Sequence, residues 1–179
     1  MIPATPPSIP HLIDAATVHR LLDFPSLIEA LHREHLKGVD QLQELILDQG
    51  GASGNAFLLL PAWRHWEAIG VKLVTSFPGN LAGSEGLPSV QGSYVLFDGR
   101  NGSVRAVIDG AALTLRKTAA DSALAARLLA REDARTMLMV GAGALAPFVI
   151  EAMRAVRPSL GRILVWNRTQ ARVEALISR

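Results

Sequence analysis

One short stretch constrains the fold of this chain more than any other. A largely apolar run over residues 136–140 leads into the spacing Gly-x-Gly-x-x-Ala over residues 141–146, and apolar residues resume through Met153. This order predicts a strand, a tight turn and a helix, which together open a dinucleotide-binding unit. A plain strand–turn–helix packing unit is the alternative, because the spacing alone does not require a ligand.

Each small residue of this turn has a physical role in a dinucleotide-binding unit. Gly141 permits the sharp turn, and Gly143 has no side chain to keep a pyrophosphate away from the backbone. Ala146 lets the helix lie close to the strand. The phosphates would bind the N–H groups at the positive end of the helix dipole. The predicted cofactor-binding positions are therefore Gly141, Ala142, Gly143, Ala144 and Leu145.

Composition limits the class of protein. The 179 residues, 49% of them hydrophobic, suffice for one large or two small domains with a sizeable core. A net charge of only +2 without a long Lys/Arg run does not indicate nucleic-acid binding. There is no cysteine for a disulfide framework, and the five histidines form no metal-binding pattern, so we predict no metal site.

The N-terminal residues and the apolar runs bear on location. Residues 1–7 lack the basic and apolar regions of a secretory signal. The longest apolar stretch is the glycine-turn region, which is too short and too interrupted by Gly and Pro to cross a bilayer. We therefore expect a cytoplasmic protein without a membrane partner.

The rest of the chain has a helical start, a strand-rich middle and an alternating strand–helix end. After a Pro-rich arm, the patterns predict helices at 14–22, 25–38, 111–130, 144–156 and 170–177, and strands at 12–13, 42–47, 56–60, 68–76, 90–97, 104–108, 136–140 and 162–166. Pro61 is expected to end its strand. The middle strands should form a mostly antiparallel sheet, with the two early helices covering one face.

These elements predict an α/β protein in which an α+β domain is followed by the start of a Rossmann-type domain. We expect a substrate-binding and dimerisation domain over residues 1–118, a connecting helix over 119–133 and the Rossmann part over 134–179. Only the first βαβ unit of a dinucleotide fold is present. We therefore expect the chain to be a fragment of a longer protein, or its sheet to be completed from outside.

Three further stretches accompany the glycine turn: residues 70–80, 86–92 and 113–126. In this order the four motifs resemble the ornithine cyclodeaminase/mu-crystallin family, over about residues 40–179. The resemblance implies an antiparallel dimerisation and substrate domain joined to a Rossmann domain. It also implies a homodimer that binds NAD(H) or NADP(H) and acts at the carbon–nitrogen centre of a small amino or imino acid.

The resemblance assigns roles to residues of the first three motifs. Lys72 matches the family lysine that holds the substrate carboxylate, although the residue alone could equally be a sheet lysine or part of an ion pair. The family has Arg directly before Thr118 at a carboxylate and cofactor contact; here that position is Lys117, with Arg116 before it. Either cation could take the role. Ser89 matches a position near the nicotinamide.

The residues after the second parallel strand bear on the cofactor. An Asp or Glu at this strand end binds the ribose 2′-hydroxyl in NAD sites, whereas an Arg accommodates a 2′-phosphate. This chain has Asn167, Arg168 and Thr169 there, and the same triplet resembles NADP(H)-binding members. A surface arginine is the alternative. We favour NADP(H), with NAD(H) possible.

Departures from the family pattern limit the substrate assignment. Ornithine cyclodeaminases carry an arginine and a glutamate near the turn that here reads Leu-Leu-Leu-Pro over residues 58–61, so ornithine is less supported. The family's catalytic aspartate would lie beyond Arg179, and we assign no catalytic residue. The leading hypothesis is NADP(H)-dependent reduction of a ketimine acid. The alternatives are conversion of ornithine to proline and ammonia with bound NAD, an NADPH-dependent binding protein without turnover, and a structural fragment that binds no nucleotide.

Overall fold

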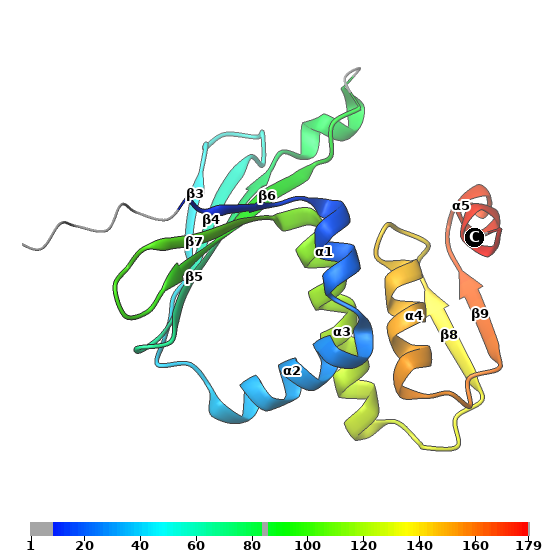
Figure 1. The fold of residues 1–179 in the computed structure, drawn as a ribbon. Helices are drawn as coiled ribbons and strands as arrows, with labels where there is room; N and C mark the ends of the chain where they lie inside the picture. The colour runs from blue at the N-terminus through cyan, green and yellow to red at the C-terminus, as the bar shows by residue number, and fades with distance from the viewer. Residues whose placement is uncertain (1–8, 84–85, 179) are drawn as a thin grey trace, which may run out of the picture. The chain divides into compact units, whose positions relative to one another are not determined.

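The computed structural model describes residues 9–83 and 86–178, which form two compact units (Figure 1). The first unit comprises the described residues up to Val18 together with Gly38–Leu113. The second comprises His19–Lys37 together with the residues from Thr114 onward. Helices α1 (Ala15–Leu21) and α3 (Gly110–Leu129) each begin in the first unit and end in the second.

A mostly antiparallel sheet forms the first unit. Within the described residues its strands are β1 (His11–Ile13), β2 (Gln41–Leu42), β3 (Leu45–Asp48), β4 (Ala56–Arg64), β5 (Ala68–Ser76), β6 (Val90–Asp98) and β7 (Val104–Asp109). The order is β1-β7-β6-β5-β4-β2, with β3 also paired to β4. Only β1 and β7 pair in parallel among these strands. A 3₁₀ helix, η1 (Pro78–Ala82), lies between β5 and β6. The predicted antiparallel sheet is confirmed.

The prediction that Pro61 ends a strand is wrong, because β4 continues through it to Arg64. Pro61 lies opposite Gln43, in the interruption between β2 and β3, and its carbonyl accepts the Gln43 N–H over 3.2 Å. The missing N–H of the proline faces this same side, where the neighbouring strand is broken. Proline therefore cannot return a hydrogen bond to the Gln43 carbonyl, and the strand predicted over residues 42–47 is interrupted there, as two short strands.

Parallel strands and helices alternate in the second unit. It contains α2 (Phe24–Lys37), most of α3, β8 (Thr136–Val140), α4 (Ala146–Val156), β9 (Arg162–Trp166) and α5 (Gln170–Ile177). β8 and β9 pair in parallel, with Thr136 opposite Arg162 and Val140 opposite Trp166. The β8–α4–β9 arrangement is the first βαβ unit of a Rossmann-type fold, and it confirms the predicted α/β class.

Alanines of α3 allow three helices to pack closely. Ala119, Ala120 and Ala123 are fully buried, and they share a core with residues of α2 and α4, among them Phe24 and Val149. We expected α2 to cover a face of the antiparallel sheet, and this expectation is wrong, because its apolar face packs on α3 and α4. The spacing of apolar residues identifies the buried face of a helix but not its partner.

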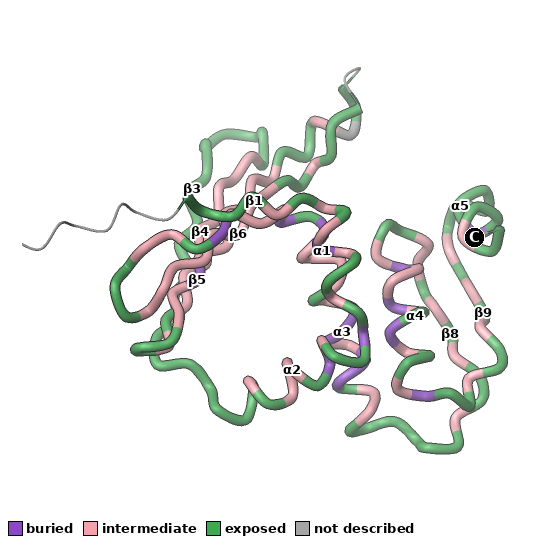
Figure 2. The backbone as a smooth tube through the Cα atoms, viewed as in Figure 1, coloured by how far each residue is buried: buried purple, intermediate pink, exposed green. Residues whose placement is uncertain are grey.

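The small sheet of β8 and β9 buries one face only. Met137 and Met139 pack toward the helical core. The alternate residues on the other face are large, apolar and exposed: Leu138, Val140, Leu164 and Trp166. Figure 2 shows this alternation along both strands. None of the described helices is long and apolar enough to span a membrane.

Candidate functional site

The turn between β8 and α4 has the backbone that its glycines predict. Gly141 has a φ of 109°, in the region that favours glycine. Its N–H donates to the Trp166 carbonyl over 2.7 Å, which ties the turn to the end of β9. A Cβ placed on Gly143 would meet no atom within 4 Å, so the space in front of this residue is open. The turn can therefore admit a ligand close to its backbone.

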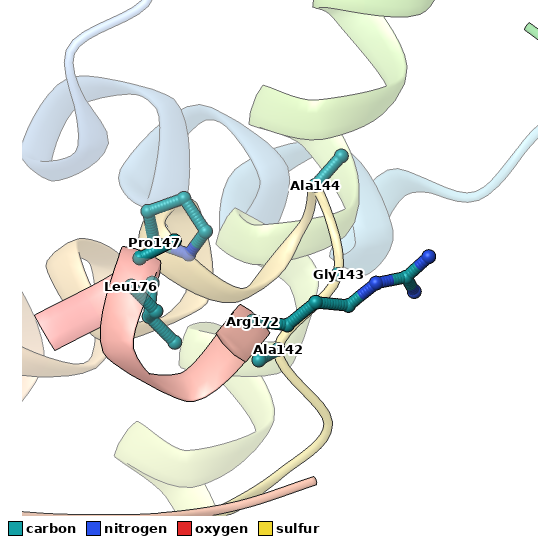
Figure 3. Close-up of a pocket in the computed structure, with 7 residues that line it drawn as sticks. Ala142, Gly143, Ala144, Pro147, Arg172 and Leu176 are labelled. Carbon is teal, nitrogen blue, oxygen red and sulfur yellow. The ribbon is translucent and has the colours of Figure 1, made fainter. Parts of the chain in front are cut away.

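A cavity of about 320 Å³ lies beside this turn (Figure 3). Its walls come from the glycine turn, from α4 and from α5: Ala142, Gly143, Ala144, Pro147, Arg172, Ala175 and Leu176. One wall is thus backbone with small side chains, and the α5 wall carries a cation. Close access to backbone N–H groups and a nearby positive charge are what the phosphates of a dinucleotide require.

Asn167 links the two loops that border the cavity. Its side-chain oxygen accepts the Ala142 N–H over 3.3 Å, and its side-chain nitrogen donates to the Thr169 carbonyl over 3.0 Å. The glycine turn and the loop after β9 are therefore joined through one amide side chain. The sequence predicted Asn167 as a cofactor contact, and its observed hydrogen bonds hold the shape of the site.

Two arginines follow β9. Arg168 is exposed in the loop, beside Thr169, which precedes α5 and makes no side-chain capping bond. Arg172, the third residue of α5, lines the cavity instead. Sequence reasoning missed Arg172 because it considered only the triplet directly after the strand. The available signal was helical geometry, since side chains in a first turn lean back toward the helix N-terminus.

Arg116 is held inside the second unit. Its side chain is 12% exposed, and its guanidinium carbon lies 4.7 Å from the Phe24 ring centre and 5.6 Å from that of Phe148. The same group donates to His19 Nδ1 over 3.3 Å, to the His19 carbonyl over 3.1 Å and to Glu151 over 3.4 Å. Two aromatic rings and three hydrogen bonds thus engage this guanidinium.

Lys117 points away from that core. Its side chain is about half exposed and pairs with Asp121, one helical turn further along α3. Asp121 also lies 3.3 Å from Nε2 of His35, on α2. Thr118 is half-buried, and its carbonyl accepts the Ser122 hydroxyl over 2.9 Å. Of the two adjacent cations, Lys117 is the more accessible to a small anion.

Lys72 and Ser89 belong to the first unit. Lys72 is a half-buried residue in the middle of β5, directly opposite Leu60 on β4 and Tyr94 on β6. Burial raises the pKa of the Tyr94 phenol. Ser89 directly precedes β6, and its carbonyl accepts the Phe77 N–H over 2.7 Å. Ser89 therefore closes the segment that connects β5 and β6.

Comparison with known proteins gives consistent matches. The model of the ornithine cyclodeaminase/mu-crystallin family matches residues 15–179. Protein SAR DEFICIENT 4 of Arabidopsis thaliana is 44% identical over 70% of this chain and 39% of its own length. Delta(1)-pyrroline-2-carboxylate reductase of Paracoccus denitrificans is 36% identical over 95% of this chain and 52% of its own length.

A solved structure shares the fold. Delta(1)-pyrroline-2-carboxylate reductase of Thermococcus litoralis, in complex with NADH and L-proline, matches 94% of this chain and 53% of its own chain. The TM-score is 0.83 and the sequence identity is 26%. This chain thus spans about half the length of the relatives that it matches.

Proposed function

This chain belongs to the ornithine cyclodeaminase/mu-crystallin family, and we propose that its second unit binds a nicotinamide dinucleotide with which the protein reduces a small ketimine acid. The observation that carries the proposal is the open glycine turn at Gly143, beside a cavity of about 320 Å³. The matched proteins include Δ1-pyrroline-2-carboxylate reductases, so the proposed substrate class is a cyclic imino acid of this kind.

The backbone of the turn supports binding of a pyrophosphate. The Ala142 N–H donates to Asn167, and the Ala146 N–H donates to the Gly143 carbonyl. The N–H groups of Gly143 and Ala144 have no acceptor among the described residues. Helix α4 also lacks a side-chain cap, which leaves its positive end open to an anion. The pyrophosphate would bind these two N–H groups.

The preferred cofactor in this proposal is NADP(H). No Asp or Glu occurs between Trp166 and Val173, where a carboxylate would bind a ribose 2′-hydroxyl. The same segment carries Arg168 and Arg172, and positive charge favours the additional phosphate of NADP(H). When bound, the cofactor supplies the hydride that reduces the imine carbon.

A cation of the first unit would hold the substrate carboxylate. In this proposal Lys72, in the middle of β5, binds it and so fixes the face of the imine that is reduced. Within the second unit, Lys117 is more open to an anion than Arg116, because Arg116 is held by Phe24, Phe148, His19 and Glu151, whereas Lys117 has one exposed pairing, with Asp121. Lys117 is half exposed.

The residues beside Lys72 favour an imino acid over a diamine. The segment of β4 that pairs across Lys72 reads Leu58, Leu59 and Leu60, and Leu60 lies directly opposite the lysine. A second ammonium group on a substrate would need a carboxylate or several hydrogen-bond acceptors when it leaves water. Apolar side chains suit the carbon ring of a cyclic ketimine.

The test is oxidation of NADPH by Δ1-pyrroline-2-carboxylate, followed by nicotinamide absorbance, in the protein that carries this chain. We expect Lys72→Ala to lower kcat/KM by about 100-fold, because a desolvated charge pair with the substrate is worth about 3 kcal/mol. Lys37→Ala is the matched control, because Lys37 is exposed on α2 and pairs only with Glu34 among the described residues. Unchanged turnover in Lys72→Ala would reject the carboxylate site, and no NADPH oxidation by any ketimine acid would reject the activity.

A further inference from the structure

The cavity beside the glycine turn has one cationic side chain in its wall. Arg172 is the third residue of α5 and lines the cavity together with Gly143 and Ala144. Figure 3 shows its side chain extending from α5 past Gly143. A side chain in the first turn of a helix leans back toward the N-terminus, so this arginine reaches toward the loop that follows β9.

Arg172 forms no ion pair within the described structure. No carboxylate pairs with it in residues 9–83 or 86–178. Its helical neighbour Glu174 is close to Gln170 instead, at 3.4 Å. The first turn of α5 contains no acidic residue. The wall of the cavity therefore presents a guanidinium whose donors are available to a ligand.

The position of this guanidinium indicates which phosphate of a dinucleotide it would contact. The pyrophosphate belongs at the start of α4, where the Gly143 and Ala144 N–H groups can receive it. The adenosine ribose belongs at the end of the second strand, which here is Trp166 of β9. Arg172 lies on α5, the helix that follows β9. It is part of the cavity wall that connects the expected pyrophosphate position with the expected ribose position.

We propose that Arg172 binds the 2′-phosphate of NADP(H) and is the residue that makes the site prefer NADP(H) over NAD(H). This inference rests on the proposed function, because it requires a nicotinamide dinucleotide in the cavity. A 2′-phosphate carries more than one negative charge and presents oxygens that a guanidinium fork can bind in pairs. The ribose of NAD(H) presents only a hydroxyl there, and gains little from a cation. Arg168, in the loop before α5, adds a second positive charge after the same strand.

The test uses binding rather than turnover. The dissociation constants of NADPH, NADH, 2′,5′-ADP and 5′-AMP are measured by calorimetry on the 179-residue chain and on Arg172→Gln. We expect Arg172→Gln to weaken NADPH and 2′,5′-ADP by about tenfold or more, and to change NADH and 5′-AMP by less than about twofold. Arg172→Lys should recover part of the lost affinity, because it keeps the charge without the fork.

A matched arginine controls for a general loss of positive charge. Arg162→Gln changes an exposed arginine at the start of β9, the opposite end of the strand from the cavity, and should leave all four constants within about twofold. Equal weakening of NADPH and NADH by Arg172→Gln would overturn the inference, because it would assign Arg172 to the pyrophosphate. Equal affinity of the unaltered chain for NADPH and NADH would overturn it while leaving the proposed function in place. Failure to bind either dinucleotide would overturn both.

Discussion

Tyr94 is the single tyrosine of the chain, and it is half-buried in the antiparallel sheet. It lies directly opposite Lys72 in the β5–β6 pair. A Cβ on Gly70 would collide with its hydroxyl, so glycine at position 70 is what allows the ring to lie over β5. Burial raises the pKa of this phenol above its ordinary value of 10.0.

The raised pKa of Tyr94 predicts a specific titration. Phenolate absorbance should have its midpoint above 10.0 in the folded chain and return to about 10 in urea. The unfolded state then loses the proton first, so this group leaves stability unchanged below pH 10 and reduces it as the pH rises from there toward the folded pKa. Tyr94→Phe should remove that part of the decline. A folded-state midpoint at or below 10.0 would contradict the buried position.

Arg157 acts between elements, because it joins the end of α3 to the end of α4. Its side chain is buried, and the guanidinium lies within hydrogen-bonding distance of five backbone carbonyls, at 2.8 to 3.1 Å, with Nη2 shared among three of them. Three of these acceptors are in or just after the last turn of α3: Ala126, Arg127 and Ala130. The cation thus satisfies the Arg127 and Ala130 carbonyls, which the helix end leaves without backbone partners, and adds a second bond to the Ala126 carbonyl, which also accepts the Ala130 N–H.

Removing this arginine should loosen the second unit. We expect Arg157→Met to lower the free energy of unfolding by about 2–4 kcal/mol, since several buried carbonyls lose charge-assisted hydrogen bonds at once. Arg154→Met is the control, because Arg154 is exposed in the last turn of α4, three residues before Arg157, and its loss should change stability by less than about 0.5 kcal/mol. Urea denaturation measures the free energy of unfolding of both variants. Equal stability of the two would show that the carbonyls find other partners.

At the scale of elements, the sequence predicted best where local chemistry decides the structure. The apolar run at residues 136–140 and the glycine turn predicted the bounds of β8 and α4 to within two residues. Turn geometry restricts which residues can follow a strand, and so makes these bounds predictable. The partner of α2 could not be predicted, because an apolar face fits any apolar surface of suitable shape. The effect of Pro61 was predicted wrongly for a related reason. Whether its missing N–H ends a strand depends on the strand that lies beside it.

The same distinction applies to the candidate site. The glycine positions follow from backbone geometry, and the structure gives Gly141 its positive φ and Gly143 its open space. The roles of Asn167 and Arg172 depend on which loops and helices meet across the cavity. A motif read along the chain identifies residues that are adjacent in sequence, whereas Arg172 reaches the site from the next helix.

For the molecule as a whole, the chain combines an antiparallel sheet unit with the first βαβ unit of a Rossmann-type fold. It belongs to the ornithine cyclodeaminase/mu-crystallin family and spans about half the length of its matched relatives. Turnover is therefore a property to be measured on the protein that carries this chain. The proposed dinucleotide site, in contrast, consists of described residues between β8 and α5, so dinucleotide binding is the property to measure on the chain itself.

Calorimetric titration of NADPH into the unaltered chain, Gly143→Val and Gly161→Val tests the central claim most directly. A Cβ added at either glycine meets no atom within 4 Å, and neither glycine has a positive φ, so both variants should fold as the unaltered chain does. Gly161 directly precedes β9, at the far end of that strand from the cavity. We predict that Gly143→Val weakens NADPH binding by at least about tenfold, because the new methyl groups occupy the pyrophosphate position, and that Gly161→Val changes it by less than about twofold. Equal NADPH affinity in Gly143→Val and the unaltered chain would contradict a dinucleotide seat at this turn.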